Sequence, residues 1–364
     1  MNILVLYANK RNESAGWTET KFLEDFATEC GRNSIECRLV GERMPDHIPG
    51  WGLKEYMRKY FRNNVDWIMG YNHPYPNWLS SPPRKPRPEG FSGRLFEWNY
   101  DMHVAPDALI EEANANIDLW LLRCTIASTF FPTMKSWFQC KGATPDEWIA
   151  NGYCVQREPD YFTKQITTQY RFFPLTADAT VFKPISQKDY DIAMVGVLSP
   201  FYPIRTAIGN EIVDFTKAHR LRLLFHVSPP DKYSGNIEAV LQNPALRKQY
   251  SIGPDYAERI AKSKMLVFCS GFAKAPIAKY FEGMMAGTAV VADTPANAAE
   301  LHFEPDRNFI SIDASNWKDE ILYYLDNTQD REEIALRGRE TAMKYHTNRV
   351  RAKELIAHLK GASV

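Results

Sequence analysis

The sequence lacks the charge imbalance, cysteine pairing and long apolar runs that assign many proteins to a class at once. Its 44 basic and 44 acidic residues cancel, so the whole chain has no electrostatic pull toward nucleic acid or a membrane surface. The six cysteines are scattered, with no C-x-x-C and no pairing with histidine at zinc spacing. No apolar run approaches the roughly 20 residues that cross a bilayer. These absences favour a reduced, cytoplasmic protein without a transmembrane segment, and they leave its oligomeric state open.

Two nucleotide-binding signatures are also missing. A dinucleotide site would show G-x-G-x-x-G after a strand, but Gly50-Trp51-Gly52 lies in a predicted loop and has no third glycine. The chain has no G-x-x-x-x-G-K-[ST] motif either. A dinucleotide-dependent oxidoreductase and a P-loop kinase are therefore disfavoured, although another enzyme built on Rossmann-like domains stays open.

What the chain does have is a repeated alternation of apolar strand and amphipathic helix, which predicts an α/β protein. A buried strand over residues 3–7 is followed by a polar loop and by a helix over 18–30 that Thr18 would cap. Further strands are predicted over 35–40, 95–98, 167–173, 192–198, 221–227, 265–269, 289–293 and 309–312, and helices over 53–63, 106–116, 204–219, 254–263 and 317–327. An apolar run spans residues 117–124. With about 150 residues per domain as a guide, the pattern predicts two doubly wound, Rossmann-like domains facing across a cleft.

A basic, proline-rich segment interrupts the first half. Between Trp51 and Arg94 there are eight basic residues and three acidic ones, and six prolines crowd the loop over residues 73–93. Two interpretations stay open. The segment is either a solvated helix face followed by a basic loop, or a platform for an anionic partner.

The most informative pair of residues is Lys279 and Glu282, at the start of a predicted helix that precedes a buried strand. Residues three apart share a helix face, so both side chains can address one ligand. A helix start that carries a lysine suits a phosphate, and a carboxylate one turn later could accept hydrogen bonds from ribose hydroxyls. The pair therefore suggests a nucleotide site, with a surface ion pair as the alternative.

Three motifs together resemble the GT-B glycosyltransferases, most clearly over residues 174–359. The phrase from Pro174 to Pro184 is similar to the linker between the two domains of that family. The turn at Gly196, followed by Ser199 and by Arg205, resembles the glycine turn and pyrophosphate-binding arginine of the nucleotide domain. Lys279 with Glu282 is similar to the basic residue and ribose-binding glutamate of the family's nucleotide motif. Among members, the chain looks most like the spore-coat-maturation glycosyltransferases and, more distantly, the phage DNA glucosyltransferases.

The resemblance implies a GT-B fold and a glycosyltransferase that uses a nucleotide sugar, UDP-linked, as donor. Residues 1–180 would bind the acceptor, residues 185–345 the donor, and a helix within 346–364 would cross back to the first domain. Arg205 and Lys279 would hold the pyrophosphate and Glu282 the ribose. This positive charge could replace a metal ion, so a metal-independent reaction without a cofactor is expected.

One departure from the family leaves the donor sugar open. Many members have a second glutamate seven residues before Glu282, where this chain has Ala275. Contacts with the sugar are therefore expected from Ser270 and Gly271, and the stereochemical outcome stays open. Asp189-Tyr190-Asp191 looks like a metal-binding motif of other glycosyltransferases, but it precedes a strand and should lie on the amino side of the sheet, so no metal site is expected there.

Asp101 is the first candidate for the catalytic base, because it follows a short strand whose carboxyl end should face the cleft. Its segment is similar to the strand-end aspartate segment of the spore-coat and phage members. His103 is the competing base, with a side-chain pKa nearer neutrality. The alternative is that Asp101 caps the next helix and His103 packs beneath it. Gly16, in the first loop, would let the backbone approach the donor or the acceptor, unless it is an ordinary turn residue.

The acceptor and the enzymatic role itself each have an expectation attached. The acceptor is expected to be a glycan or a nucleic acid that binds through the basic segment, residues 54–94. The alternative to an enzyme is a catalytically degenerate GT-B-like module that only binds nucleotide.

Overall fold

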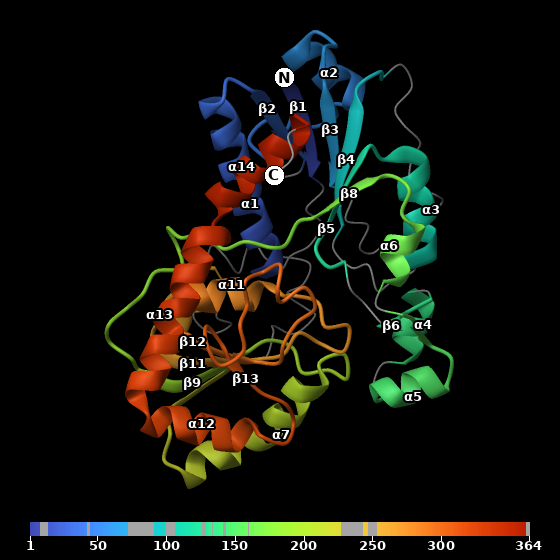
Figure 1. Cartoon of the computed structure of the whole chain (residues 1–364). Coiled ribbons are helices and arrows are strands. Elements are labelled where there is room, and N and C mark those ends of the chain that lie inside the picture. Colours follow the sequence, from blue (N-terminus) through green and yellow to red (C-terminus); the bar gives the residue numbers. More distant parts are fainter. Residues whose placement is uncertain are drawn as a thin grey trace.

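The computed structural model describes residues 1–7, 14–41, 44–71, 91–99, 106–125, 129–132, 134–140, 143–158, 160–226, 243–246 and 253–361. Within these residues the chain forms two α/β domains, one above the other in Figure 1, each built on a parallel sheet. The sequence predicted this architecture, and the structure confirms it.

The first sheet has six strands in the order β2-β1-β3-β4-β5-β8, and every described pairing in it is parallel. Its central strands are apolar and buried on both faces, as a parallel sheet between helices requires. For example, all four residues of β5 are buried. The strands are β1 (Asn2–Tyr7), β2 (Glu36–Val40), β3 (Trp67–Tyr71), β4 (Arg94–Asn99), β5 (Leu119–Leu122) and β8 (Gln169–Phe172).

Helices of the first half surround this sheet and extend below it. They are α1 (Ser14–Arg32), α2 (Leu53–Phe61), α3 (Pro106–Asn116), α4 (Met134–Gln139), α5 (Pro145–Ala150) and α6 (Tyr161–Gln165). Local sequence sets several of their ends. At α5, Thr144 and Glu147 form a capping box with Pro145 in the first turn. Strands β6 (Thr129–Phe130) and β7 (Val155–Gln156) pair as a two-stranded ribbon, and α4 and α5 lie between them in the sequence.

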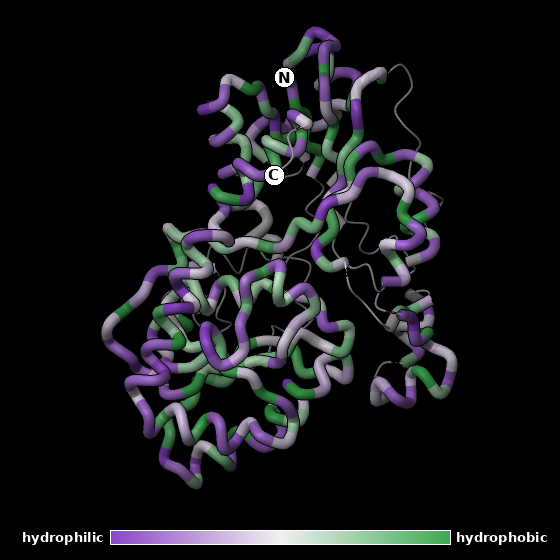
Figure 2. The backbone as a smooth tube through the Cα atoms, viewed as in Figure 1, coloured by the Kyte–Doolittle hydropathy of each residue, from purple (hydrophilic) through white to green (hydrophobic). Residues whose placement is uncertain are grey.

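The second sheet repeats the same winding, with five strands in the order β10-β9-β11-β12-β13. Its strands are β9 (Tyr190–Val195), β10 (Leu223–His226), β11 (Ser263–Val267), β12 (Ala289–Ala292) and β13 (Ile310–Ser311). Its helices are α7 (Pro203–Ala218), α10 (Pro254–Ala261), α11 (Ala278–Met285), α12 (Trp317–Asp326) and α13 (Thr328–Tyr345). In Figure 2 the tube of α13 is largely hydrophilic, which fits a helix that covers the sheet with one face and meets water with the other.

Local predictions failed at three places in the first half. Helix α1 begins at Ser14, so Thr18 lies inside it rather than at its cap. Strand β3 was not predicted, because its apolar run is short and lies between Asp66 and the glycine and tyrosine that end the strand. Helices α4 to α6 were not predicted either, since each is only five or six residues long and carries too few turns for a helical period to show.

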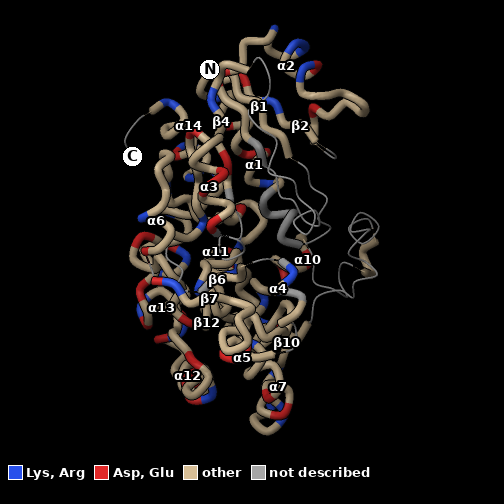
Figure 3. The backbone as a smooth tube through the Cα atoms, turned by 90° about the vertical axis from the view of Figure 1, so that its right-hand side faces the viewer, with Lys and Arg blue, Asp and Glu red and all other residues tan. Residues whose placement is uncertain are grey.

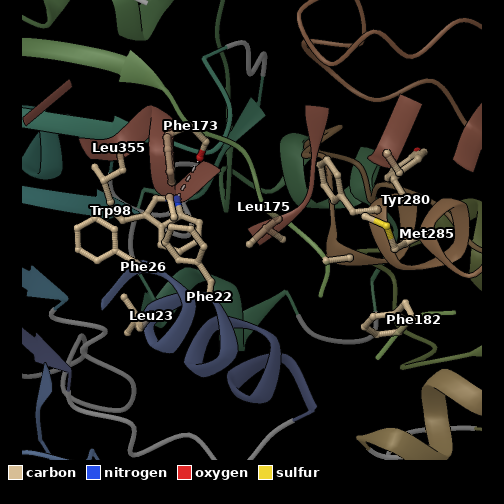
Figure 4. Close-up of a cluster of buried hydrophobic side chains, with 14 of the residues drawn as sticks. Phe22, Leu23, Phe26, Trp98, Phe173, Leu175, Phe182, Tyr280, Met285 and Leu355 are labelled. Carbon is tan, nitrogen blue, oxygen red and sulfur yellow. Dashed lines mark hydrogen bonds between the residues drawn. The ribbon is translucent and has the colours of Figure 1, made fainter. Parts of the chain in front are cut away.

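One hydrophobic core runs through both domains and the connection between them. Figure 4 shows Phe22 and Trp98 of the first domain near Phe173 and Leu175 of the connection, with Tyr280 of the second domain further along the same cluster. Trp98 Nε1 donates a hydrogen bond to the Phe173 carbonyl oxygen, 3.1 Å away. The connection is thus packed into the fold over part of its length and is not a free tether.

The last helix, α14 (Asn348–Leu359), packs against α1 (Figure 1). Asn348 Nδ2 donates to Asp25 Oδ2 at 2.8 Å, and Trp67 Nε1 donates to the Leu359 carbonyl oxygen at 3.1 Å. The chain therefore passes between the domains twice, and the two passages lie side by side where Ala177 pairs with Thr347. Among the described residues, no helix is long and apolar enough to cross a membrane.

A segment of the first half packs on the second domain. Phe131, Trp148 and the buried Cys140 and Cys154 form one hydrophobic cluster with Phe201, Phe272 and neighbouring residues of the second domain. The rings of Trp148 and Phe272 are 5.1 Å apart, edge to face. By this packing, the described residues between 131 and 154 belong with the second domain as much as with the first.

Candidate functional site

The site forms where the winding of the second sheet reverses. Strands β10 and β11 lie on opposite sides of β9, so the connections that leave the carboxyl ends of β9 and β11 diverge to opposite faces. Such a switch point is where open α/β sheets bind ligands. Gly196 follows β9 directly, and its backbone N–H donates to the His226 carbonyl oxygen at the end of β10, 2.9 Å away.

Gly196 leaves room for two cations. Its φ of +128° lies in a region that side chains rarely adopt. A Cβ placed on it would stand 3.1 Å from Arg205 Nη1 and 3.4 Å from Lys279 Nζ. The glycine therefore marks a point at which a guanidinium and an ammonium group converge on bare backbone.

Arg205 belongs to the first turn of α7 and is 2% exposed. Its guanidinium donates to two carbonyl oxygens, that of Val197 at 3.2 Å and that of Cys269 at 3.0 Å. The Tyr202 ring lies 4.0 Å from Arg205 Cζ. None of these partners is charged, and no described carboxylate forms an ion pair with Arg205. A buried cation held by neutral groups is an attractive partner for an anion.

Lys279 is the second residue of α11 and is half-buried. Burial lowers the pKa of its ammonium to about 8, Arg205 lowers it further in the same direction, and Glu282 opposes the shift. Like Arg205, Lys279 forms no ion pair with a described carboxylate. Two like charges this close repel each other, and an anion bound between them would offset that repulsion.

Glu282 lies one turn further along α11 and is buried, with 5% of its surface exposed. Its Oε2 accepts a hydrogen bond from the Tyr256 hydroxyl of α10, 2.9 Å away. Burial and the neighbouring carboxylate raise the pKa of Tyr256 well above its usual value, so the phenol stays protonated and remains a donor. Tyr256 thereby fixes the orientation of the Glu282 carboxylate.

The loop between β11 and α11, residues 268–277, carries the other predicted donor contacts. Ser270 is fully buried, and its hydroxyl donates to Asp293 Oδ2 at 2.7 Å. Gly271 has a φ of +84°, and a Cβ there would meet the Phe201 ring at 2.8 Å. Ser199 contributes its carbonyl oxygen, which accepts from Tyr202 N and Thr206 Oγ1, both at 2.8 Å, and so shapes the turn into α7.

The structure thus brings together Gly196, Arg205, Lys279 and Glu282. Gly16 is different: it lies in the first turn of α1 and not in a loop, contrary to the prediction. Asp101 and His103, the predicted catalytic residues, lie outside the described residues, as does the loop over 73–90.

The acidic motif at Asp189-Tyr190-Asp191 lies at the amino end of β9, at the opposite edge of the sheet from Gly196. Lys264 Nζ is 2.8 Å from Asp191 Oδ1, and Arg222 donates to both oxygens of this carboxylate. These cations lower the pKa of Asp191 to about 2 against the opposing effect of burial. In the part of the chain that the structure describes, no cluster of His, Cys, Asp and Glu residues is arranged to hold a metal ion.

Sequence reasoning missed Tyr256, Cys269 and Asp293. Each belongs to the site through a contact with a residue distant in sequence, and none stands in a recognisable motif. A helical pattern does place Tyr256 on the apolar face of α10, but that pattern indicates only burial.

Comparison with known proteins bears on the fold and on the second half of the chain. Residues 219–357 match the family described as Glycosyl transferase-like. The whole chain superimposes on sucrose-phosphate synthase from Thermosynechococcus elongatus, with a TM-score of 0.60, 12% identity and 100% of both chains covered. HepE of Anabaena, in complex with UDP and glucose, gives a TM-score of 0.56 at 13% identity, with 99% of each chain covered.

An alpha-glucosyltransferase in complex with UDP and a 13-mer DNA gives a TM-score of 0.60 at 13% identity, with 99% of this chain and 100% of that chain covered. No curated protein matches the chain by sequence. The fold is that of the GT-B glycosyltransferases over its full length, and the family match falls on the half that holds Glu282 and Lys279. The chain thus has the GT-B fold, with a glycosyl transferase-like family match over residues 219–357.

Proposed function

We propose that the protein transfers a sugar from a UDP-linked donor to an acceptor hydroxyl. The observation that carries the proposal is the convergence of Arg205 and Lys279 on Gly196, without an ion-paired carboxylate among the described residues. The structures of HepE and of the alpha-glucosyltransferase, which share the fold, contain UDP, and this supports UDP as the nucleotide.

Arg205 and Lys279 would bind the diphosphate and stabilise the negative charge that develops on it as the bond to the sugar breaks. Arg205 is fixed by two carbonyl oxygens and so needs little reorganisation when that charge appears. The N-terminus of α11, which carries Lys279, adds the positive end of a helix dipole. We propose that these groups suffice for a reaction that needs neither a metal ion nor a cofactor.

Glu282 would bind the ribose hydroxyls. A carboxylate that Tyr256 orients can accept hydrogen bonds from vicinal hydroxyl groups at a fixed angle. The sugar would then extend from the diphosphate toward Ser270 and Gly271. Because the Ser270 hydroxyl already donates to Asp293, the backbone of this loop is the better candidate for sugar contacts.

We propose Asp101 as the general base, with His103 as the competing candidate. Both follow β4, whose carboxyl end belongs to the same edge of the first sheet as Thr125, and Thr125 contacts the second domain. Asp101→Asn is expected to abolish transfer and leave UDP affinity unchanged. Near wild-type turnover would remove Asp101 from this role and direct the same test to His103→Gln.

The acceptor proposal rests on α2. Lys54 and Arg58 lie one turn apart on this helix, and Arg62 is its C-cap residue. All three are exposed, and none pairs with a described carboxylate. Figure 3 places α2 at the end of the molecule opposite α7 and α12. A polyanionic acceptor, a nucleic acid or an acidic glycan, could bind α2 while a distant part of it reaches the donor.

This acceptor proposal predicts a steep salt dependence. Replacing Lys54, Arg58 and Arg62 by glutamate should weaken oligonucleotide binding and flatten its dependence on salt, because fewer counterions are then released. Lys217→Glu, on the exposed surface of α7, is the matched control. A flat salt response of the wild-type protein would favour a neutral acceptor.

Titration of the protein with UDP, GDP and their common sugar conjugates, in the presence of a chelator, tests the function as a whole. A ligand at 100 times its Kd should stabilise the folded state by about 2.7 kcal/mol and raise Tm. UDP and one UDP-sugar are expected to do so. UDP binding without any turnover on a panel of acceptors would favour a degenerate binding module, and no binding of any nucleotide would overturn the proposal.

A further inference from the structure

Asp293 is a buried carboxylate that the proposed reaction does not use directly. It follows β12 at the carboxyl edge of the second sheet and is 3% exposed. Three donors reach its side chain at 2.7 Å: Ser270 N at Oδ1, and both Ser270 Oγ and Lys274 Nζ at Oδ2. The Tyr280 hydroxyl donates to the Asp293 backbone carbonyl oxygen and lies 3.4 Å from Oδ1.

These donors come from both ends and the middle of one stretch of chain. Ser270 opens the loop over residues 268–277, Lys274 stands at its turn, and Tyr280 belongs to the first turn of α11. Asp293 therefore fixes the loop and the helix that follows it from a single point. Asp293 contacts Tyr280, the residue after Lys279, and Ser270, the residue after Cys269. Lys279 and Cys269, which flank the proposed diphosphate site, therefore each lie one residue away from this anchor.

The loop needs such an anchor, because its backbone is strained. Gly271 has a φ of +84° and Lys274 a φ of +55°, and the second of these is uncommon for a lysine. The Ala296 N–H donates to the Lys274 carbonyl oxygen at 2.7 Å, which holds the same turn from the segment after Asp293. Strained backbone persists where the surroundings determine it from several sides.

Aromatic contacts also hold the loop, through Phe272. The Phe272 ring lies 4.9 Å from that of Phe201, 5.3 Å from that of Phe131 and 5.1 Å from that of Trp148. The Phe272 N–H also donates to the Phe201 carbonyl oxygen at 2.9 Å. Polar contacts with Asp293 and apolar contacts with residues 131–154 thus leave the loop little freedom.

We propose that Asp293 is a positioning residue for the nucleotide diphosphate. By holding Ser270, Lys274 and Tyr280, it fixes the position of Lys279. It also fixes Cys269, whose carbonyl oxygen accepts a hydrogen bond from Arg205. This inference rests on the proposed function, because it takes Arg205 and Lys279 to be the diphosphate ligands. Asp293 itself would not contact the donor and would act only through these residues. Its removal would shift the two cations relative to each other and weaken the site that they form together.

Asp191 provides a matched control. It is 7% exposed, belongs to the same sheet and is bound by Arg222 and Lys264, but it lies at the amino edge. Asp293→Asn and Asp191→Asn both remove a buried, ion-paired carboxylate and should lower Tm alike. Only Asp293→Asn should also shift the residues that form the proposed diphosphate site.

The test is UDP affinity by isothermal titration calorimetry, at a temperature at which each variant is fully folded. Asp293→Asn is expected to weaken UDP binding about tenfold or more and to raise the donor KM more than it lowers kcat, while Asp191→Asn stays within about twofold of wild type. Equal affinity of folded Asp293→Asn and wild type would overturn the inference, as would an equal loss in the Asp191 control.

If Asp293→Asn does not fold, Lys274→Met tests the positioning role of Asp293 instead. Lys274 is half exposed, so this variant should fold, and loss of its tie to Asp293 is expected to weaken UDP binding severalfold. Unchanged affinity and KM in Lys274→Met would then overturn the inference. Failure of the wild-type protein to bind UDP would be recognised first and would overturn the proposed function together with this inference.

Discussion

Asn297 and Thr125 join the two domains through reciprocal hydrogen bonds. Thr125 N donates to Asn297 Oδ1 at 3.0 Å, and Asn297 Nδ2 donates to Thr125 Oγ1 at 2.6 Å. Thr125 follows β5 in the first sheet, and Asn297 follows β12 in the second, so the carboxyl edges of both sheets meet at this contact. Asn297 is 3% exposed and has a φ of +57°, a conformation that asparagine tolerates better than most residues.

The first prediction concerns the stability of this contact. Asn297→Gly keeps the backbone conformation accessible but leaves the Thr125 N–H without its partner, so it should lower the free energy of unfolding by about 1–3 kcal/mol. Asn297→Ala should lower it by about 1 kcal/mol more, because a Cβ without a compensating side-chain hydrogen bond disfavours positive φ. Urea unfolding measures both. A glycine variant as stable as wild type would show that the contact contributes nothing to stability.

The second prediction concerns Gly196. Gly196→Ala should weaken UDP binding about tenfold or more, because alanine rarely adopts a φ of +128° and its Cβ would stand 3.1 Å from Arg205 Nη1. Gly31→Ala is the control, since a Cβ at Gly31 in helix α1 would meet nothing within 4 Å. The control should bind UDP normally and be more stable by up to about 1 kcal/mol. Normal UDP binding by Gly196→Ala, measured by calorimetry, would argue against a ligand at this turn.

The third prediction separates ribose from diphosphate. Glu282→Ala should weaken UDP binding about tenfold or more and leave the affinity for inorganic pyrophosphate unchanged, whereas Lys279→Met should weaken both. Glu304, an exposed acidic residue of the same domain, supplies the control Glu304→Ala. A parallel loss of pyrophosphate affinity in Glu282→Ala would mean that the variant disturbs the whole site and does not report on ribose.

The fourth prediction concerns pH. The Lys279 ammonium has a pKa of about 8 in the folded protein, below its unfolded value of 10.5. Between these two values the unfolded chain binds more protons, so this residue makes the empty protein more stable as pH rises from about 8 toward 10. UDP binding should change in the opposite direction, because it requires the charged ammonium.

Lys279→Arg isolates this effect, since a guanidinium stays charged over the whole range. The difference in log Kd between wild type and Lys279→Arg should therefore change little around pH 7 and shift in favour of the arginine variant above pH 8. Calorimetric titrations at several pH values measure it. A constant difference from pH 7 to 9 would show that the Lys279 pKa is not lowered into this range.

Much of the fold could be predicted because its signals are local. The strands of the second domain are short apolar runs between helices of clear period, and all five were predicted within a few residues of their observed ends. Prediction failed around β3 and α4 to α6, where elements are short and burial depends on distant partners such as Phe272 and Leu359. There, tertiary packing outweighs local propensity.

The sequence by itself determined that Lys279 and Glu282 share a helix face and that two α/β domains follow each other, because helical spacing and strand alternation are properties of neighbouring residues. Only the tertiary structure decided what surrounds that pair. Arg205 reaches Lys279 because the sheet winding places the ends of β9 and β11 side by side, and Tyr256 reaches Glu282 because α10 packs against α11. Contacts such as that of Asp293 with Ser270 depend on which strands are neighbours, and strand order is set by the packing of the whole chain.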